Sequence, residues 1–353
     1  MRTTSANPEL SSFRSDSGNL DIIRGVAVMS VFLAHLHEIL TGRNSETGWH
    51  FAQMGVLTFF VHTSMVLMLS LERTRLEGKA LFYSFYLRRF FRIYPLAIFC
   101  VTVAMVMSVT PDIEQPVFHW TWGQYLSNVA LTTNLTYSRN MVGGLWTLPL
   151  EVQMYLTLPF LFVLGRMRGL GTLALLWVLS IPAALLQSSV SQRLNVMSYA
   201  PCFLAGVIAW RISITAKRRF PGWLWPFAFM ATWPIFLAAS HKTDMPFRWA
   251  FCLALGLAIP WFEEIRYKPL LKVAHFFAKY SYGIYLSHIA VILWTFALPI
   301  PRAAQWAVFV PLAFLVPVAM FHLIEDPMIK VGQRIAKRVF TKAPPTLAPA
   351  ETG

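Results

Sequence analysis

Stretches of about 20 mostly apolar residues, the length that a helix needs to cross a bilayer, recur along almost the whole sequence. Only 13% of the residues are charged, whereas a soluble globular domain carries roughly 25%. A surface that faces lipid explains both observations, so the sequence predicts an all-α integral membrane protein with about ten transmembrane helices. The candidate spans are 20–40, 52–70, 93–110, 145–164, 170–187, 195–212, 221–240, 247–262, 280–299 and 304–324.

The lysines and arginines predict how these spans are oriented. With the N-terminus in the cytoplasm, the outer loops contain six of the 30 lysines and arginines, and the cytoplasmic segments contain the rest. Cytoplasmic loops of membrane proteins carry such an excess of positive charge. The bias therefore predicts an even number of spans with both termini cytoplasmic, and it explains the net charge of +14 without nucleic-acid binding. The six outer cations are Arg43, Arg139, Arg193, Lys242, Arg248 and Arg302.

One membrane domain with two short flanking segments is expected. Residues 1–19 are polar and serine-rich without the apolar core of a signal peptide, so they are predicted to stay in the cytoplasm. Residues 20–327 form the predicted transmembrane domain. Residues 328–353 begin with a basic stretch suited to an amphipathic helix on the anionic inner leaflet and end in a Pro- and Ala-rich segment expected to be disordered. The three cysteines lie in apolar runs without metal-ligand spacing, so no metal site is expected.

The first span, LDIIRGVAVMSVFLAHLHEIL, contains two ionisable residues of particular interest. Arg24 and His35 are eleven residues apart, which is about 20° from a whole number of helical turns, so both lie on one face about 16 Å apart along the axis. Asp21 can pair with Arg24 three residues later. Ionisable groups inside a span are costly and mark functional sites. His35 can take a proton from an attacking hydroxyl or carry an acyl group itself; the alternative is a hydrogen bond to a neighbouring helix.

A cluster of arginines occupies residues 85–95 (FYLRRFFRIYP), where the third span begins. Arg88, Arg89 and Arg92 fall within about one turn, and Arg89 and Arg92 share a face. Guanidinium groups match phosphates, so the cluster suits a phosphate-bearing donor such as coenzyme A. Such cations also anchor the cytoplasmic end of a span, and the charge alone does not decide between the two roles.

Residues 143–160 (GGLWTLPLEVQMYLTLPF) contain a carboxylate near a predicted helix start. Pro149 suits the first helical position, which would put Glu151 in the first turn near the positive end of the helix dipole. Glu151 can then act as a helix-start carboxylate, orient a histidine or bind an acceptor. Tyr155, four residues later, shares its face.

For several other aromatic and ionisable residues, a structural or interfacial role explains the pattern as well as a functional one. Trp120 and Trp122 belong to a predicted outer segment and suit either an interfacial belt or a platform for sugar rings. His288 and His322 are interpreted as structural. Glu325 and Asp326 precede Pro327 and are expected to end the last helix at the cytoplasmic surface.

The order of these motifs resembles the acyltransferase-3 family of bacterial membrane proteins over roughly residues 18–335. The matching residues are Arg24 of LDIIRG and His35 eleven residues later, Arg89 and Arg92 of RxxR, Trp146, Glu151 and Tyr155 of WTLPLEVQMY, Ser281 to His288 of SYGIYLSH, and Phe321 to Pro327 of FHLIEDP. In WTLPLEVQMY, Thr147 replaces the serine of the family pattern. The second span, GVLTFFVHTSMVLM, departs from the family pattern, because Leu57 replaces an acidic residue and His62 adds a polar group.

The resemblance implies transfer of an acyl group, often acetyl, from cytosolic acyl-CoA to a hydroxyl of an envelope glycan or similar acceptor at the bacterial inner membrane. It implies that His35 is the catalytic histidine, with Glu151 needed nearby. The partners would be membrane lipid, acyl-CoA as donor substrate rather than a bound cofactor, and a glycan or lipid-linked saccharide. The expected donor-binding residues are Arg24, Arg88, Arg89 and Arg92, and the expected acceptor contacts are Trp146, Tyr155, Trp120 and Trp122.

A different class of function suits the same residues. A transporter or flippase of a polar or lipid-linked substrate would also need many spans and a charged path. No inverted repeat or pair of broken helices, which many transporters show, is evident in the sequence.

Overall fold

The computed structural model describes residues 17–42, 46–74, 76–110, 118–217, 220–238 and 245–340. Most of the predicted N-terminal segment and residues 341–353 of the predicted tail lie outside these ranges. Within them the regular structure is helical, with a single bridge between Phe220 and Phe262. The predicted all-α membrane protein is confirmed.

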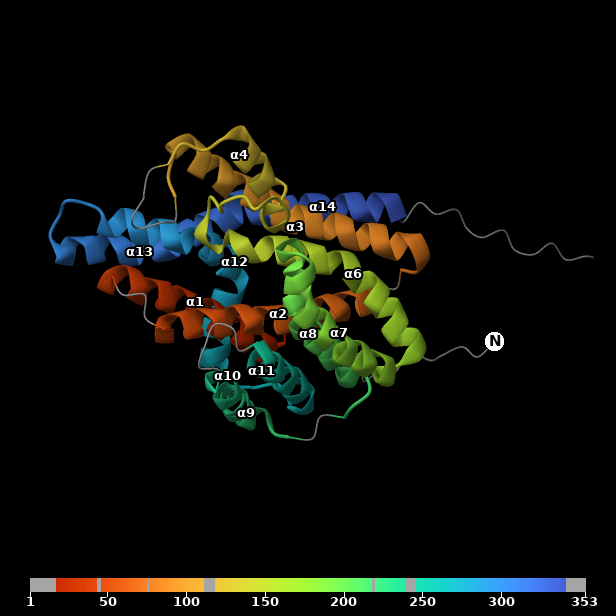
Figure 1. Ribbon diagram of the computed structural model, residues 1–353. Helices are drawn as coiled ribbons and strands as arrows, with labels where there is room; N and C mark the ends of the chain where they lie inside the picture. The colour runs from red at the N-terminus through yellow and green to blue at the C-terminus, as the bar shows by residue number, and fades with distance from the viewer. Residues whose placement is uncertain are drawn as a thin grey trace, which may run out of the picture.

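Figure 1 shows the α-helices packed as a bundle. In the first half of the chain they are α1 (Gly18–Thr41), α2 (Glu46–Thr74), α3 (Gly78–Met107), α4 (Trp122–Val129), α5 (Thr133–Thr136) and α6 (Thr147–Arg168). In the second half they are α7 (Leu170–Val190), α8 (Val196–Ser213), α9 (Trp225–Ala231), α10 (Trp233–Leu237), α11 (Met245–Ala258), α12 (Lys268–Phe296), α13 (Arg302–Met320) and α14 (Asp326–Phe340).

Seven helical segments in the described ranges are long and apolar enough to cross a membrane. Every predicted span contains helix, but the α-helices in the described part of 221–240 are the short α9 and α10, each with a proline as its second residue. The count of ten and the cytoplasmic position of both termini therefore stay predictions. The seven segments are Gly18–Thr41, Gly48–Thr74, Gly78–Met107, Gly143–Arg168, Leu170–Val190, Gln192–Ser213 and Arg302–Val339.

The last helix continues past Pro327, which corrects the expectation that the helix ends there. A π-helical turn, Phe321–Glu325, joins α13 to α14. Proline lacks the N–H of a regular helical bond, and the wider turn lets the helix continue around it. Glu325, the last residue of this turn, faces inward and is only 1% exposed. α14 lies beside α3 (Figure 1), with Gly332 against Phe91.

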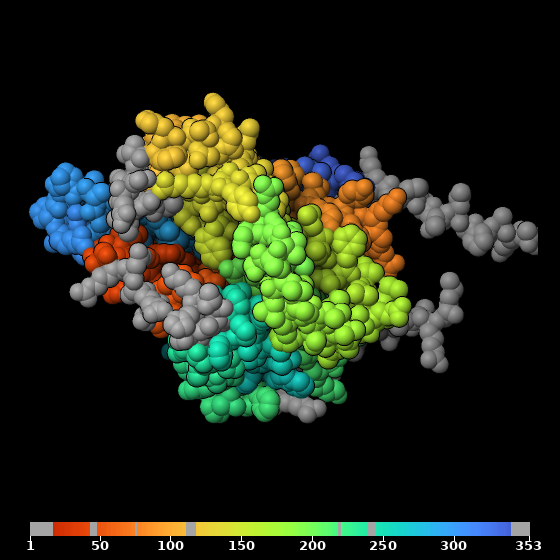
Figure 2. Space-filling view, viewed as in Figure 1, coloured from red at the N-terminus to blue at the C-terminus, as the bar shows by residue number. Residues whose placement is uncertain are grey.

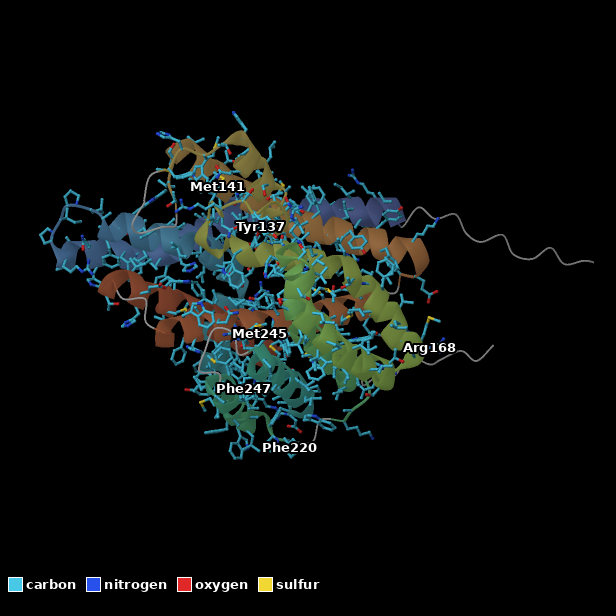
Figure 3. The ribbon with its side chains drawn as sticks, in the orientation of Figure 1. Tyr137, Met141, Arg168, Phe220, Met245 and Phe247 are labelled. Carbon is cyan, nitrogen blue, oxygen red and sulfur yellow. The ribbon has the colours of Figure 1, made fainter. Side chains whose placement is uncertain are left out.

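The centre of the bundle consists of α1 packed between α2 and α12, with α8 on the other side of α2. Figure 2 shows the segment that contains α4 as a cap on one flank, and α9 to α11 as a group on the opposite flank. In Figure 3, Tyr137 and Met141 mark the segment that leads into α6, and Arg168 marks the far end of that helix. These central helices surround the candidate site.

Small residues permit the closest helix contacts, as is common in membrane proteins. A Cβ atom added at Gly206 of α8 would lie 2.0 Å from the Ser64 hydroxyl oxygen and 2.2 Å from the Val61 carbonyl oxygen of α2. A Cβ added at Gly55 of α2 would lie 2.5 Å from the Ala27 carbonyl oxygen of α1. The backbones of α1, α2 and α8 therefore touch without room for a side chain.

This packing predicts that Gly206→Ala lowers the free energy of unfolding by about 1–3 kcal/mol, because overpacking forces α8 away from α2. Thermal unfolding of the purified protein in detergent measures the effect as a lower midpoint. Gly171→Ala is the matched control, since nothing lies within 4 Å of a Cβ added there, and it should leave the midpoint unchanged or slightly higher. Equal midpoints for the two variants would show that the α2–α8 contact is not close.

Candidate functional site

Arg24 and His35 of α1 both reach α12, as their helical spacing predicts. The Arg24 Nε donates to the Ser281 hydroxyl at 2.7 Å. Nδ1 of His35 lies 3.0 Å from Nε2 of His288. Ser281 and His288 are seven residues, or about two turns, apart on α12. One face of α1 thus lies along one face of α12.

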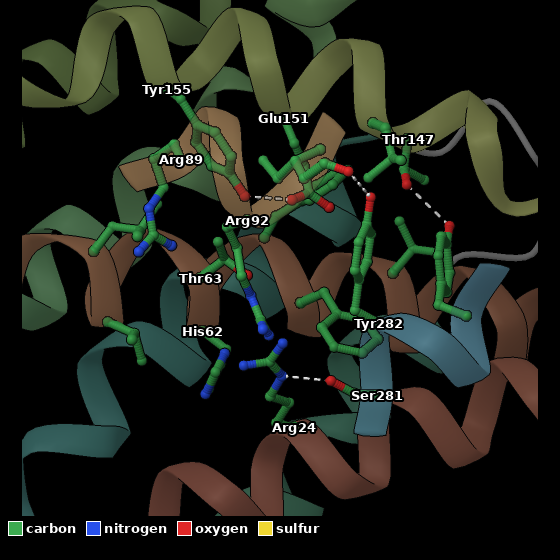
Figure 4. A pocket seen from close by; sticks show the side chains of 18 residues that line it. Arg24, His62, Thr63, Arg89, Arg92, Thr147, Glu151, Tyr155, Ser281 and Tyr282 are labelled. Atoms are coloured by element: carbon green, nitrogen blue, oxygen red, sulfur yellow. Dashed lines mark hydrogen bonds between the residues drawn. The ribbon is translucent and has the colours of Figure 1, made fainter. Parts of the chain in front are cut away.

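A cavity of about 100 Å³ lies among α1, α2, α3, α6 and α12 (Figure 4). Its ionisable lining brings together residues that are far apart in the sequence. They are Arg24, His62, Arg89, Arg92, Glu151, Tyr155, Tyr282 and Tyr285. Five expected site residues therefore lie in one cavity inside the membrane domain: Arg24, Arg89, Arg92, Glu151 and Tyr155.

Two of the charged residues in the cavity are held by protein partners. Arg92 forms an ion pair with the buried Glu325. The Tyr155 hydroxyl donates to the Glu151 carboxylate one turn earlier on α6 (Figure 4). The first partnership was not expected, because the sequence placed Glu325 at the membrane surface.

The guanidinium groups of the other two arginines, Arg24 and Arg89, have hydrogen-bond donors that remain available to a ligand. Among the described residues, Arg24 donates one hydrogen bond, to Ser281. Arg89 makes no hydrogen bond or ion pair with any residue in the described part of the chain. Asp21, the predicted partner of Arg24, instead contacts Nδ1 of His275 at 2.9 Å. Both residues are half-buried, and taking a charge out of water without a partner is costly, so these two groups suit an anionic ligand that enters the cavity.

Glu151 occupies a different helical position from the one predicted. A 3₁₀ turn, Gly143–Trp146, leads directly into α6, which begins at Thr147 rather than near Pro149. Glu151 therefore lies beyond the first turn, where the helix dipole has little effect. Its carboxylate lines the cavity and contacts Tyr155, not a histidine.

His35 does not line the cavity; it lies with His288 behind one wall. That wall includes Tyr285, whose ring centroid is 6.1 Å from that of His288. The Tyr285 and Thr147 hydroxyl oxygens are 3.0 Å apart. The histidine pair therefore adjoins the cavity through Tyr285.

Four other expected site residues lie outside the cavity lining. Arg88 bonds Ser84 of its own helix, with its Nε 3.1 Å from the hydroxyl oxygen. Trp120 donates to a loop carbonyl, Trp146 packs against a neighbouring tyrosine ring, and Trp122 is 71% exposed. Of the residues expected to bind the acceptor, the cavity contains Tyr155 alone.

The structure adds several residues that sequence reasoning did not assign to the site. Ser281, Tyr285 and His288 follow the i, i+4, i+7 spacing of one helix face. This spacing is visible in the sequence SYGIYLSH and indicates that the three side chains share a face. His62 is 4% exposed, and its Nδ1 has no hydrogen-bond partner among the described residues. The described ranges hold no group of three or more His, Cys, Asp or Glu residues that could bind a metal.

Comparison with known proteins identifies the family to which this chain belongs. The model of the acyltransferase-3 family, described as an acyltransferase domain, matches residues 17–322. A search of curated proteins and a search of solved structures each find no match. The matched range contains both histidines of the pair and every ionisable residue of the cavity. Since the match covers most of the chain, this protein belongs to the acyltransferase-3 family.

Proposed function

We propose that this protein transfers an acyl group, in the first instance acetyl, from acyl-CoA to a hydroxyl of an envelope glycan or a similar acceptor at the bacterial inner membrane. The observation that carries the proposal is the pair of half-buried arginines, Arg24 and Arg89, whose guanidinium groups line the cavity and pair with no carboxylate of the described residues. Membership of an acyltransferase family supports the reaction class.

The phosphates of coenzyme A suit this cavity. Guanidinium groups bind phosphate oxygens through charge-assisted, often bidentate hydrogen bonds. Arg89 and Arg24 have donors to spare, whereas the partnership with Glu325 fixes the position of Arg92. We assign Arg24, Arg89 and Arg92 to the donor, and leave out Arg88, which bonds within its own helix.

The acyl group would react next to the histidine pair. Ser281, which holds Arg24, and His288, which contacts His35, are separated by about 10 Å of rise along α12. An extended phosphopantetheine arm spans such a distance. A donor anchored on the arginines would thus present its thioester near His35 once Tyr285 moves aside.

The proposed reaction is attack of the acceptor hydroxyl on the thioester carbonyl. The new C–O bond forms, the C–S bond breaks, coenzyme A leaves as its thiolate, and the hydroxyl proton passes to Nε2 of His35. Alternatively His35 first takes the acyl group and then passes it to the hydroxyl. In both routes Glu151 and Tyr155 shape the cavity wall along which the donor lies.

Arg89→Gln should weaken acyl-CoA binding by roughly 10-fold or more, because a hydrogen bond to a charged group contributes about 1.5–3 kcal/mol. The thermal midpoint without ligand should change little, since Arg89 makes no hydrogen bond or ion pair with a described residue. Isothermal titration of coenzyme A into the purified protein in lipid nanodiscs measures the affinity.

Two neighbouring arginines are the controls. Arg88→Gln should leave the affinity within about two-fold, because Arg88 lies outside the cavity. Arg92→Gln should lower the thermal midpoint, because loss of one partner of a buried ion pair costs about 3–5 kcal/mol. Unchanged coenzyme A affinity in Arg89→Gln would show that the donor does not bind in this cavity.

His35→Ala should abolish transfer while leaving membrane insertion and coenzyme A binding intact, because the histidine lies outside the arginine cavity. The measurement is transfer of radiolabelled acetyl groups from acetyl-CoA to envelope glycan by the purified protein in lipid. His37→Ala, which changes an exposed histidine two residues later on α1, should retain activity. Full transfer by His35→Ala would exclude its catalytic role, and ligand movement without labelled product in wild type would favour the transporter.

A further inference from the structure

His288 is a buried polar residue whose contacts determine more than its own position. His288 is 3% exposed. Its side chain lies between the backbone of α12 and His35 of α1. The rings of His35 and His288 have centroids 5.1 Å apart and planes inclined by 39°. That geometry fits a hydrogen bond between ring nitrogens rather than stacking.

The α12 backbone fixes which nitrogen of His288 carries the proton. Nδ1 lies 2.9 Å from the Tyr285 carbonyl oxygen and 3.1 Å from the Ile284 carbonyl oxygen. A carbonyl oxygen only accepts hydrogen bonds, so Nδ1 must be the N–H donor. In the neutral ring Nε2 then has a lone pair and can only accept.

His35 must be the donor in the hydrogen bond between the two rings. Its Nδ1 lies 3.0 Å from the accepting Nε2 of His288, so Nδ1 of His35 carries the proton. The second nitrogen of neutral His35, Nε2, therefore keeps its lone pair. Neutral histidine in water favours the opposite tautomer, with the proton on Nε2. In that tautomer Nε2 has no free lone pair and cannot act as a base.

We infer that His288 is a positioning residue that holds His35 in the Nδ1–H tautomer, with Nε2 ready to take a proton or an acyl group. This inference rests on the proposed function for its catalytic consequence, but not for the tautomer itself. His288 would also support the charged state. When His35 takes the hydroxyl proton on Nε2, its Nδ1–H can strengthen its bond to His288 or pass that proton to His288 Nε2.

The tautomer is read directly by solid-state ¹⁵N NMR of histidine-labelled protein in lipid. The signals lost in His35→Ala identify the two ring nitrogens of His35. We expect a protonated Nδ1 and an unprotonated Nε2 in wild type. His288→Gln should keep this pattern, because a glutamine oxygen can accept from Nδ1, whereas His288→Leu should shift His35 toward the Nε2–H tautomer.

Kinetics of the same variants tests the consequence. His288→Leu should lower kcat by about 10-fold or more, as expected when a general base has the wrong tautomer, with the KM for acetyl-CoA within about two-fold. His288→Gln should recover most of the loss. His322→Leu, which removes a histidine paired with the Tyr280 hydroxyl at 3.2 Å, should leave kcat unchanged.

The outcomes separate this inference from the proposed function. A wild-type spectrum with the proton on Nε2 of His35, or identical spectra and kcat for the leucine and glutamine variants, would overturn the role of His288. Transfer that persists in His35→Ala would overturn the catalytic role of His35, while the spectra would still decide whether His288 sets its tautomer.

Discussion

Guanidinium groups inside a membrane domain are the constraint on which the rest of this structure depends. An arginine in the hydrocarbon region costs several kcal/mol unless it finds partners or water. Arg92 finds one in Glu325, the last residue of the π-helical turn that joins α13 to α14. Arg24 and Arg89 have no carboxylate partner in the described structure, so the cavity carries positive charge that no nearby carboxylate neutralises. We propose that this charge binds an anionic donor substrate.

α12 connects this charged cavity to the histidine pair. Its residues Ser281, Tyr285 and His288 succeed one another on one face, and each contacts a different part of the site. Because α1 lies along the same face, Arg24 and His35 meet partners that are only two turns apart. A rigid helix of this kind sets the spacing between the group that binds the donor and the group proposed to react. Tyr285 separates the two regions, so access between them depends on its side chain.

The sequence predicted those parts of the site that periodicity alone determines. The shared face of Arg24 and His35 follows from 3.6 residues per turn, and the contact between Glu151 and Tyr155 follows from their spacing of four. It did not predict the partners of His35 or Arg92, because those contacts join residues 253 and 233 positions apart. The inward turn of Glu325 and the early start of α6 were also missed. Local signals at Pro327 and Pro149 suggested different helix ends, whereas a π-helical turn leads into α14 and a 3₁₀ turn leads into α6.

The central claim is that the arginine cavity holds the phosphates of the donor and directs its acyl group toward His35. A cryo-electron microscopy structure of the full chain in lipid nanodiscs with a non-reactive thioether analogue of acetyl-CoA tests it most directly. The account predicts phosphate density in contact with the guanidinium group of Arg89, Tyr285 displaced from Thr147, and the acyl carbonyl beside Nε2 of His35. Density for the analogue elsewhere on the protein, with the arginine cavity unchanged, would contradict it.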